Sequence, residues 1–352
     1  MKHIIHPIAL FLLSLAVLTL SGCVEPTFTG EEVPLDSLCV DTAPDTEPIV
    51  ILLEHSETEE SLVGHYVKEL ENRLEALDEG FQVTVYADSA LSGDFSTSDR
   101  MLQGNEIQIK ISGGPYGTQL EPLRFPSLSG LNRAELARVM ENEELRAYLD
   151  EACRELGIVY LGQFPSVSYA VSSKEPIHSV DDFEDLNIRL MYTGSRMGFW
   201  NALKAKPVSI ALAETLPALQ KGQFNASANN SILNIAAFEF YWEDGFVTCT
   251  DHEIYTRPVY VNETFWNGLT PGQQTAIAET LDAVCRQAAE EEPFWQAAAV
   301  AKLKAEGITI LDFPQKEKER MWALTRDAVY EAMCAVYGKE HVDYLLSFVP
   351  QA

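Results

Sequence analysis

The first residue whose type and position suggest chemistry is Arg189, which stands inside a short alternating run. In residues 186–191, leucine and isoleucine occupy every second position, so a strand would turn them to one face and the arginine to the other. A guanidinium is a planar fork of donors that can form two parallel hydrogen bonds with a carboxylate. The alternative is an ion pair with a surface acid such as Asp185, because structural ion pairs are the commoner use of arginine.

Short elements on both sides of this run would hold it in place. Ser179 precedes two acids and is typical of a helix N-cap. After the run, residues 193–203 predict a helix, 207–210 a strand and 213–222 a second helix that ends at a glycine. The segment 225–230, Asn-Ala-Ser-Ala-Asn-Asn, follows directly.

This series of elements, with Asp-His-Glu-Ile-Tyr at 251–255 and Asn-Glu-Thr-Phe-Trp at 262–266, resembles a known family. The family is the solute-binding proteins of tripartite ATP-independent periplasmic (TRAP) transporters. The resemblance is colinear over about residues 48–348, although no single motif is diagnostic. It implies an α/β, two-lobed periplasmic-binding-protein-like fold with a long helix spanning both lobes. It also implies a small organic acid as ligand and TRAP membrane permease subunits as partners.

The same resemblance assigns ligand contacts to further residues. Asn229 falls where the family has a ligand-binding asparagine, and an amide can both donate and accept hydrogen bonds. The alternative is a loop asparagine that caps its own turn. Ser168, counted back from Pro176, replaces a second arginine that the family commonly has. With one obvious cation instead of two, we expect a less charged ligand or one held by hydroxyl and amide groups.

A glycine-rich loop supplies one more candidate. Residues 113–117, Gly-Gly-Pro-Tyr-Gly, follow a predicted strand, and ligands of open α/β sheets sit at the carboxyl ends of strands. Tyr116 is therefore a candidate pocket residue, the alternative being a plain turn. The loop lacks the glycine spacing and the Gly-Lys-Ser/Thr ending of a phosphate loop. The expected ligand-binding residues are thus Arg189, Asn229, Ser168 and Tyr116.

Composition narrows the function classes. The chain has 352 residues, and its 53 acidic and 25 basic side chains give a net charge of −28. Such a surface repels nucleic acid, so we expect no nucleic-acid partner. The sequence contains no Gly-x-Ser-x-Gly, Ser-x-x-Lys or His-Glu-x-x-His motif, which favours binding over catalysis. Two alternatives stay open: an extracytoplasmic hydrolase with paired carboxylates, and a lipoprotein that presents its ligand to a sensor.

The N-terminus indicates export. A short basic region precedes the apolar run 8–18, which has signal-peptide length and is short for a membrane span. Leu-Ser-Gly-Cys at 20–23 resembles the lipobox of bacterial lipoproteins. We therefore expect Cys23 to be the lipidated first residue of the mature protein, which anchors it at a membrane outside the cytoplasm. The alternative is a plain secretory signal with an incidental cysteine.

The remaining cysteines and the histidines do not predict a metal or redox site. Five cysteines are left after Cys23, so at most two disulfides can form. No Cys or His spacing typical of a metal or redox site occurs, and we expect no metal and no cofactor. His252 has no partner at ligand spacing, and we interpret it as structural.

The domain organisation follows from the order of elements. An apolar strand at 49–53, an amphipathic helix at 61–77 and a strand at 81–86 open a doubly wound α/β lobe. Later helices are expected over 132–149, 270–306 and 317–337, the second with a break or bend at Pro293. The expected regions are a signal peptide (1–22), a lipidated cysteine and tether (23–47), lobe I (48–165 plus about 254–293), lobe II (166–253 plus about 294–320) and a C-terminal helix packing across the lobes (321–352).

Overall fold

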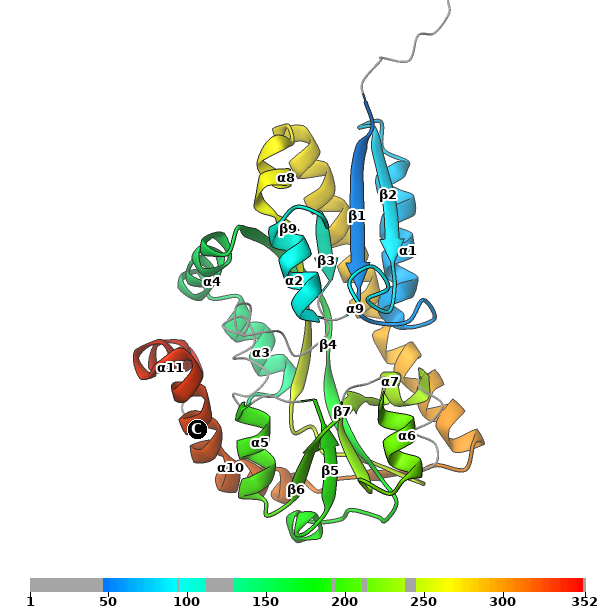
Figure 1. Cartoon of the computed structure of the whole chain (residues 1–352), viewed down its shortest axis with the longest axis vertical. Coiled ribbons are helices and arrows are strands. Elements are labelled where there is room, and N and C mark those ends of the chain that lie inside the picture. The colour runs from blue at the N-terminus through cyan, green and yellow to red at the C-terminus, as the bar shows by residue number, and fades with distance from the viewer. Residues whose placement is uncertain are drawn as a thin grey trace, which may run out of the picture. The chain divides into compact units, whose positions relative to one another are not determined.

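The computed structural model describes residues 47–93, 95–111, 130–191, 194–210, 214–237 and 245–350 (Figure 1). Its strands are β1 (Ile49–His55), β2 (Phe81–Tyr86), β3 (Ile109–Ile111), β4 (Ile158–Ser173), β5 (Asn187–Leu190), β6 (Lys206–Ser209), β7 (Ala226–Ser231), β8 (Phe246–Cys249), β9 (Ile254–Asn262) and β10 (Thr309–Asp312). Its helices are α1 (Leu62–Glu75), α2 (Phe95–Gln103), α3 (Arg133–Met140), α4 (Glu143–Glu155), the 3-10 turn η3 (Val180–Phe183), α5 (Gly194–Ala202), α6 (Thr215–Gln220), α7 (Ile232–Ala237), α8 (Glu263–Gly268), α9 (Pro271–Ala305), α10 (Gln315–Tyr337) and α11 (Lys339–Leu346).

The strands of the described residues join one sheet. Its path runs β2-β1-β3-β9-β4-β7-β5-β6, and β8 pairs with both β4 and β10. β1 is parallel to β2 and β3, and β5 is parallel to β6 and β7, whereas β4 and β9 are antiparallel to each other. We call the part built on β1–β3 the first lobe and the part built on β5–β8 and β10 the second lobe. β4 and β9 connect the two lobes. Helices and a mixed sheet make up both lobes, so the expected α/β fold is confirmed.

The two connecting strands are bent where they pass between the lobes. The pairing of β4 with β9 shifts register twice, beside Gly162 and again between Phe164 and Val167. Gly162 has a φ of 150°, which favours glycine, and Pro165 has no N–H to offer the second stretch of ladder. Irregularities of this kind bend and twist a strand locally. The local sequence therefore explains why β4 can leave one lobe and enter the other without a break.

The long helix α9 packs on both lobes, as expected. Thr270 caps it, with Pro271 at the first position. The first half packs with α1 and the strands of the first lobe through Ile277, Leu281, Val284 and Ala288, and the second half packs with α7 through Ala299 and Leu303. A break or a bend was expected at Pro293; the helix continues through this residue to Ala305, so it is not broken there.

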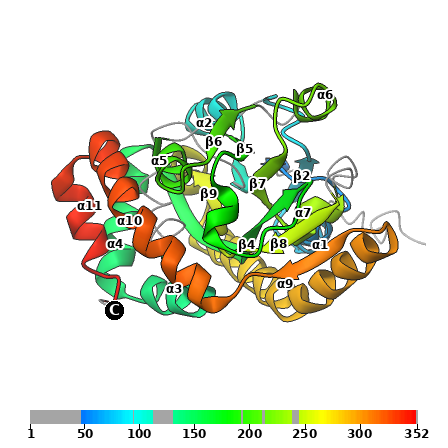
Figure 2. The same ribbon diagram turned by 90° about the horizontal axis from the view of Figure 1, so that it is seen from below.

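Two other helix predictions were wrong in their boundaries. The single helix expected over 132–149 is two helices, because α3 ends at Met140 with Glu141 as its C-cap, and the side chain of Asn142 caps α4 by accepting from the Leu145 N–H at 3.0 Å. The helix expected over 317–337 is confirmed as α10, but the C-terminal region 321–352 is not one helix, because Gly338 takes a φ of 82° between α10 and α11. These two helices lie beside α3, α4 and α5 (Figure 2).

Arg257, in the middle of β9, ties three strands together. Its side chain is fully buried, and its Nε donates to Glu57, which follows β1, at 2.5 Å. Its Nη1 donates to the carbonyl of Pro165 in β4 at 2.8 Å. Burial alone would lower the pKa of Arg257, but the charge and hydrogen bonds of Glu57 outweigh it and the pKa is raised. The guanidinium therefore stays charged and holds β1, β4 and β9 in register.

His252 has a structural environment, as interpreted from the sequence. It is buried in the connection between β8 and β9, beside the Trp200 ring at 5.0 Å between centroids. Its Nε2 donates to the Ala228 carbonyl at 2.9 Å, and its Nδ1 accepts from the Thr250 hydroxyl at 2.6 Å. The ring is neutral in this arrangement, because burial lowers the pKa of His252 to about 4.

We expect acidification to destabilise the protein through His252. Its pKa is about 6.5 in an unfolded chain and about 4 in the folded protein, so the unfolded state binds the proton first. The neutral His252 ring makes its full contribution to the free energy of unfolding above about pH 6.5. This contribution, about 3 kcal/mol, is lost as the pH falls from about 6.5 to about 4. Urea titrations across this range should show a smaller pH dependence of the free energy of unfolding for His252→Gln. Identical pH dependence in the two proteins would refute this.

Breaking the Arg257–Glu57 pair should destabilise the fold strongly. Glu57→Gln leaves a buried guanidinium without its counter-charge, which typically costs about 3–5 kcal/mol. The double substitution Glu57→Gln/Arg257→Met should recover part of this loss, because no uncompensated charge is then buried. Glu184→Gln, which removes the exposed partner of Lys204, is the matched control and should have little effect. Denaturant unfolding that finds the Glu57 and Glu184 variants equally stable would exclude a structural role for the buried pair.

Candidate ligand-binding site

Arg189 lies near the carboxyl end of β5 and is 1% exposed. The neighbouring Ile188 and Leu190 belong to a hydrophobic core, so the alternation expected from the sequence is confirmed. The Nε of Arg189 donates to the Ile210 carbonyl, at the end of β6, at 3.0 Å. The alternative of an ion pair with Asp185 is wrong, because that carboxylate pairs with Lys206 at 2.8 Å on the surface.

Polar side chains of β7 lie beside Arg189. Ser227 is its register partner on this strand, and Asn229 is two residues further towards the carboxyl end. The Oδ1 of Asn229 accepts from the Met191 N–H at 2.7 Å, so this side chain bridges the ends of β7 and β5 and does not cap its own turn. Among the described residues, the buried Oγ of Ser227 and Nδ2 of Asn230 have no hydrogen-bond partner. Buried polar atoms of this kind are rare and mark a place where a ligand or water can bond.

A second buried arginine, Arg196, lies in the first turn of α5, the helix that follows β5. Its Nε donates to Glu253 at 2.8 Å and its Nη2 donates to the other carboxylate oxygen, so the pair is bidentate. Both side chains are 3% exposed. Burial alone would lower the pKa of Arg196, but the charge of Glu253 outweighs it and the pKa is raised.

Two tyrosines connect this ion pair to the first lobe. Tyr169 of β4 stacks on Tyr255 of β9, with ring centroids 5.2 Å apart. The guanidinium carbon of Arg196 lies 5.9 Å from the centre of the Tyr169 ring, and that of Arg257 lies 5.2 Å from the centre of the Tyr255 ring. We call Arg196, Tyr169, Tyr255 and Arg257 the arginine–tyrosine row. It runs from the second lobe across the connecting strands to Glu57 of the first.

No motif in the sequence predicted this row, although a weak signal is present. Arg196 precedes Met-Gly-Phe-Trp, and Glu253 precedes Ile-Tyr, so each is a charged residue at the start of an apolar stretch. A charge in such a stretch is rarely buried without a partner. The two are 57 residues apart, however, and no local pattern pairs them.

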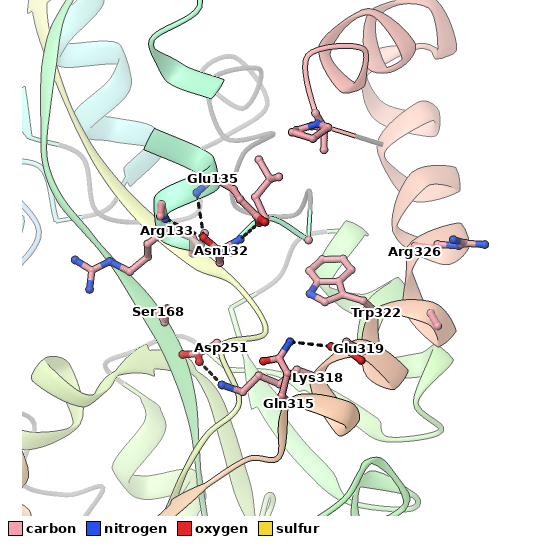
Figure 3. Close-up of a pocket in the computed structure, with 17 residues that line it drawn as sticks. Asn132, Arg133, Glu135, Ser168, Asp251, Gln315, Lys318, Glu319, Trp322 and Arg326 are labelled. Carbon is pink, nitrogen blue, oxygen red and sulfur yellow. Dashed lines mark hydrogen bonds and ion pairs between the residues drawn. The ribbon is translucent and has the colours of Figure 1, made fainter. Parts of the chain in front are cut away.

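Ser168 lies elsewhere, on the wall of a pocket of about 1090 Å³ (Figure 3). The pocket is bounded by the start of α3, by β4 and the β8–β9 connection, and by α10, from which Trp322 points inwards. Lys318 and Asp251, both on its wall, form an ion pair with each other. The polar groups of this wall are thus largely engaged among themselves.

The structure therefore brings together only part of the predicted ligand set. Arg189 and Asn229 meet at the carboxyl ends of β5 and β7, and neither is among the described residues of the pocket that Ser168 lines. Because successive side chains of a strand point to opposite faces, Tyr169 is the residue of this part of β4 that contacts Arg196. Tyr116 and the lipidation candidate Cys23 lie outside the described residues.

Other chemistries find little support in the described part of the chain. It contains no group of three or more His, Cys, Asp or Glu side chains arranged to hold a metal ion. Its cysteines, which are Cys153, Cys249, Cys285 and Cys334, are all free thiols. Burial raises the pKa of the Cys153 thiol to about 12, so this thiol is not a reactive thiolate. None of the described helices combines the length and the apolar character that crossing a bilayer requires.

Solved structures with the same architecture are two-lobed binding proteins. A TRAP periplasmic solute-binding protein from Sulfitobacter sp. NAS-14.1 with bound β-D-galacturonate superposes with a TM-score of 0.77 at 16% identity, covering 86% of this chain and 100% of that one. A TRAP periplasmic solute-binding protein from Desulfovibrio salexigens with bound orotic acid gives a TM-score of 0.76 at 17% identity, covering 86% and 98%. At these identities the likeness establishes the fold, including the two lobes.

Sequence comparison identifies the family. The C4-dicarboxylate-binding periplasmic protein DctP of Rhodobacter capsulatus is 26% identical over 306 residues, which are 84% of this chain and 90% of that protein. The profile of the family described as bacterial extracellular solute-binding protein, family 7 (DctP), matches residues 53–335. That match spans most of the chain and agrees with the resemblance seen in the sequence. The protein therefore belongs to the bacterial extracellular solute-binding proteins of family 7.

Proposed function

We propose that this protein is the extracytoplasmic solute-binding subunit of a TRAP-type secondary transporter and that it captures a small organic acid by its carboxylate. The observation that carries the proposal is the position of Arg189, buried at the carboxyl end of a strand in a chain of this family. The relatives named above bind galacturonate, orotic acid or C4-dicarboxylates, all of which carry carboxylates. A solute-binding role without catalysis is consistent with the family.

Arg189 is suited to orient the acid. Its strand and the hydrogen bond from Nε to Ile210 restrict the orientation of the guanidinium before any ligand arrives, which lowers the entropy lost on binding. An ion pair formed in a buried site is stronger than one in water. The Nδ2 of Asn230 and the Oγ of Ser227 would supply hydrogen bonds to the rest of the ligand. Asn229 would bond the ligand through its amide, and its hydrogen bond from the Met191 N–H would keep the ends of β5 and β7 together.

Binding would be coupled to closure of the lobes. The connecting strands β4 and β9 carry the arginine–tyrosine row, which joins α5 of the second lobe to Glu57 of the first. Side chains that bridge two lobes can report on the separation of the lobes, because stacking and ion pairing depend on distance. A closed form would be the form that the permease subunits recognise.

The site can be tested with Arg189. Arg189→Ala should weaken binding of the preferred acid at least about 30-fold, because a desolvated charge pair contributes about 2 kcal/mol or more. Arg189→Lys keeps the charge but loses the planar fork of donors, so its affinity should lie between those of the wild-type protein and Arg189→Ala. The measurement is the ligand-induced rise in melting temperature against a panel of galacturonate, orotate and C4-dicarboxylates.

A matched control for this test is Arg320→Gln, which removes an exposed arginine that pairs with Asp181. It should leave the melting shift unchanged. If Arg189→Ala kept the full shift, Arg189 would not belong to the ligand site.

We also propose that Cys23 anchors the protein to a membrane through attached acyl chains. The support is the sequence pattern at 20–23 and the extracellular character of the family. In cells that produce the full chain, Cys23→Ala should move the protein from the membrane fraction to the soluble extracytoplasmic fraction or leave the precursor unprocessed. Mass spectrometry of the wild-type protein should detect the added mass of acyl chains on Cys23. An unmodified cysteine in processed, membrane-bound protein would argue against the anchor.

A further inference from the structure

The Arg196–Glu253 pair lies at the same edge of the second lobe as the proposed ligand site. Arg196 lies in α5, the helix that follows β5. Glu253 follows His252, whose ring is hydrogen-bonded to the carbonyl of Ala228. Ala228 directly precedes Asn229 on β7. The carbonyl of Glu253 also accepts from the Tyr169 N–H at 2.8 Å, which fixes the glutamate to β4. The pair is therefore held between the ends of β4, β5 and β7.

We propose that Glu253 restricts the ligand to a single carboxylate. In this position Arg196 would otherwise be a second cation for the ligand, and Glu253 already holds its Nε–Nη2 edge. The inference rests on the proposed function, because it assumes that an acid binds at Arg189. It deepens that function by naming the ligand class as small monocarboxylic acids with hydroxyl or amide groups, as opposed to dicarboxylic acids.

The physical reason is the cost of burying a charge without compensation. The Arg196–Glu253 pair has no net charge, so it would offer a second ligand carboxylate beside it no net attraction to offset the loss of water. That carboxylate would also meet the negative charge of Glu253 directly, and like charges brought together at a buried interface are strongly unfavourable. A hydroxyl or amide at the same place meets neither penalty. The pair thus works by rejecting diacids more than by attracting monoacids.

The same geometry opposes a rearrangement that would accommodate a diacid. The backbone of Glu253 is fixed to β4, so its carboxylate can move only by rotation of the side chain, and that rotation would break both hydrogen bonds to Arg196. Arg196 is packed over the Tyr169 ring, which itself stacks on Tyr255. Releasing this edge of Arg196 for a ligand therefore costs two charge-assisted hydrogen bonds in a buried place.

The test uses acids that differ only in the second charge. Succinamate is compared with succinate, and glutaramate with glutarate, by isothermal titration to the wild-type protein. We expect each monoacid to bind at least about tenfold more tightly than its diacid partner. In Glu253→Gln the diacids should gain at least about tenfold in affinity, because residue 253 then no longer neutralises the charge of Arg196. In Arg196→Gln/Glu253→Gln that gain should disappear, since it depends on the arginine.

The outcomes separate this inference from the proposed function. A wild-type protein that binds diacids as tightly as their monoacid partners would overturn the restriction while leaving the carboxylate site intact. An unchanged preference in folded Glu253→Gln would do the same. If no acid bound the folded wild-type protein, the proposed function would fail and this inference with it. The wild-type comparison decides the matter even where Glu253→Gln does not fold.

Discussion

Buried arginines that hold carboxylate partners dominate the region where the two lobes meet. Removing a guanidinium from water costs several kcal/mol, and the cost is recovered only where a carboxylate and further hydrogen bonds compensate it. Arg257 meets this condition with Glu57 and the Pro165 carbonyl, and Arg196 meets it with Glu253. Each pair joins segments that are far apart in the chain. These ion pairs therefore help to specify which segments pack together, in addition to stabilising the folded protein.

The position of these pairs follows from the sheet. In the second lobe the parallel strands end at one edge, and the helix and loop that follow each strand bring their first residues to that edge. Arg189, Asn229 and Asn230 reach it from strands, and Arg196 reaches it from the first turn of α5. β4 adds Tyr169 because it is antiparallel to β7 and passes the same edge.

Local sequence signals predicted much of the fold. Thr270 and Pro271 correctly predicted the start of α9. Asn132 and Glu135 form the expected capping box at the start of α3. The predictions failed where one local signal was outweighed, by another local signal in one case and by tertiary packing in the other. The apolar periodicity over 132–149 concealed the cap at Asn142, and the proline at 293 did not break a helix that packs on both lobes. In the second case tertiary packing outweighed an unfavourable local residue, which is the usual limit of propensity arguments.

By itself, the sequence predicted that Arg189 would lie on a strand between two helices and that His252 is structural, and its resemblance to a known family implied a solute-binding protein. The position of Arg189 on a strand needs only periodicity, caps and the order of elements, which are local properties of the chain. Only the tertiary structure decided that Tyr169 and not Ser168 contacts Arg196, and that Arg196 and Arg257 each have a glutamate partner. The reason is physical: an ion pair or a ring stack between residues 57 or 200 positions apart leaves no trace in local patterns, because it depends on how the strands are brought together in space.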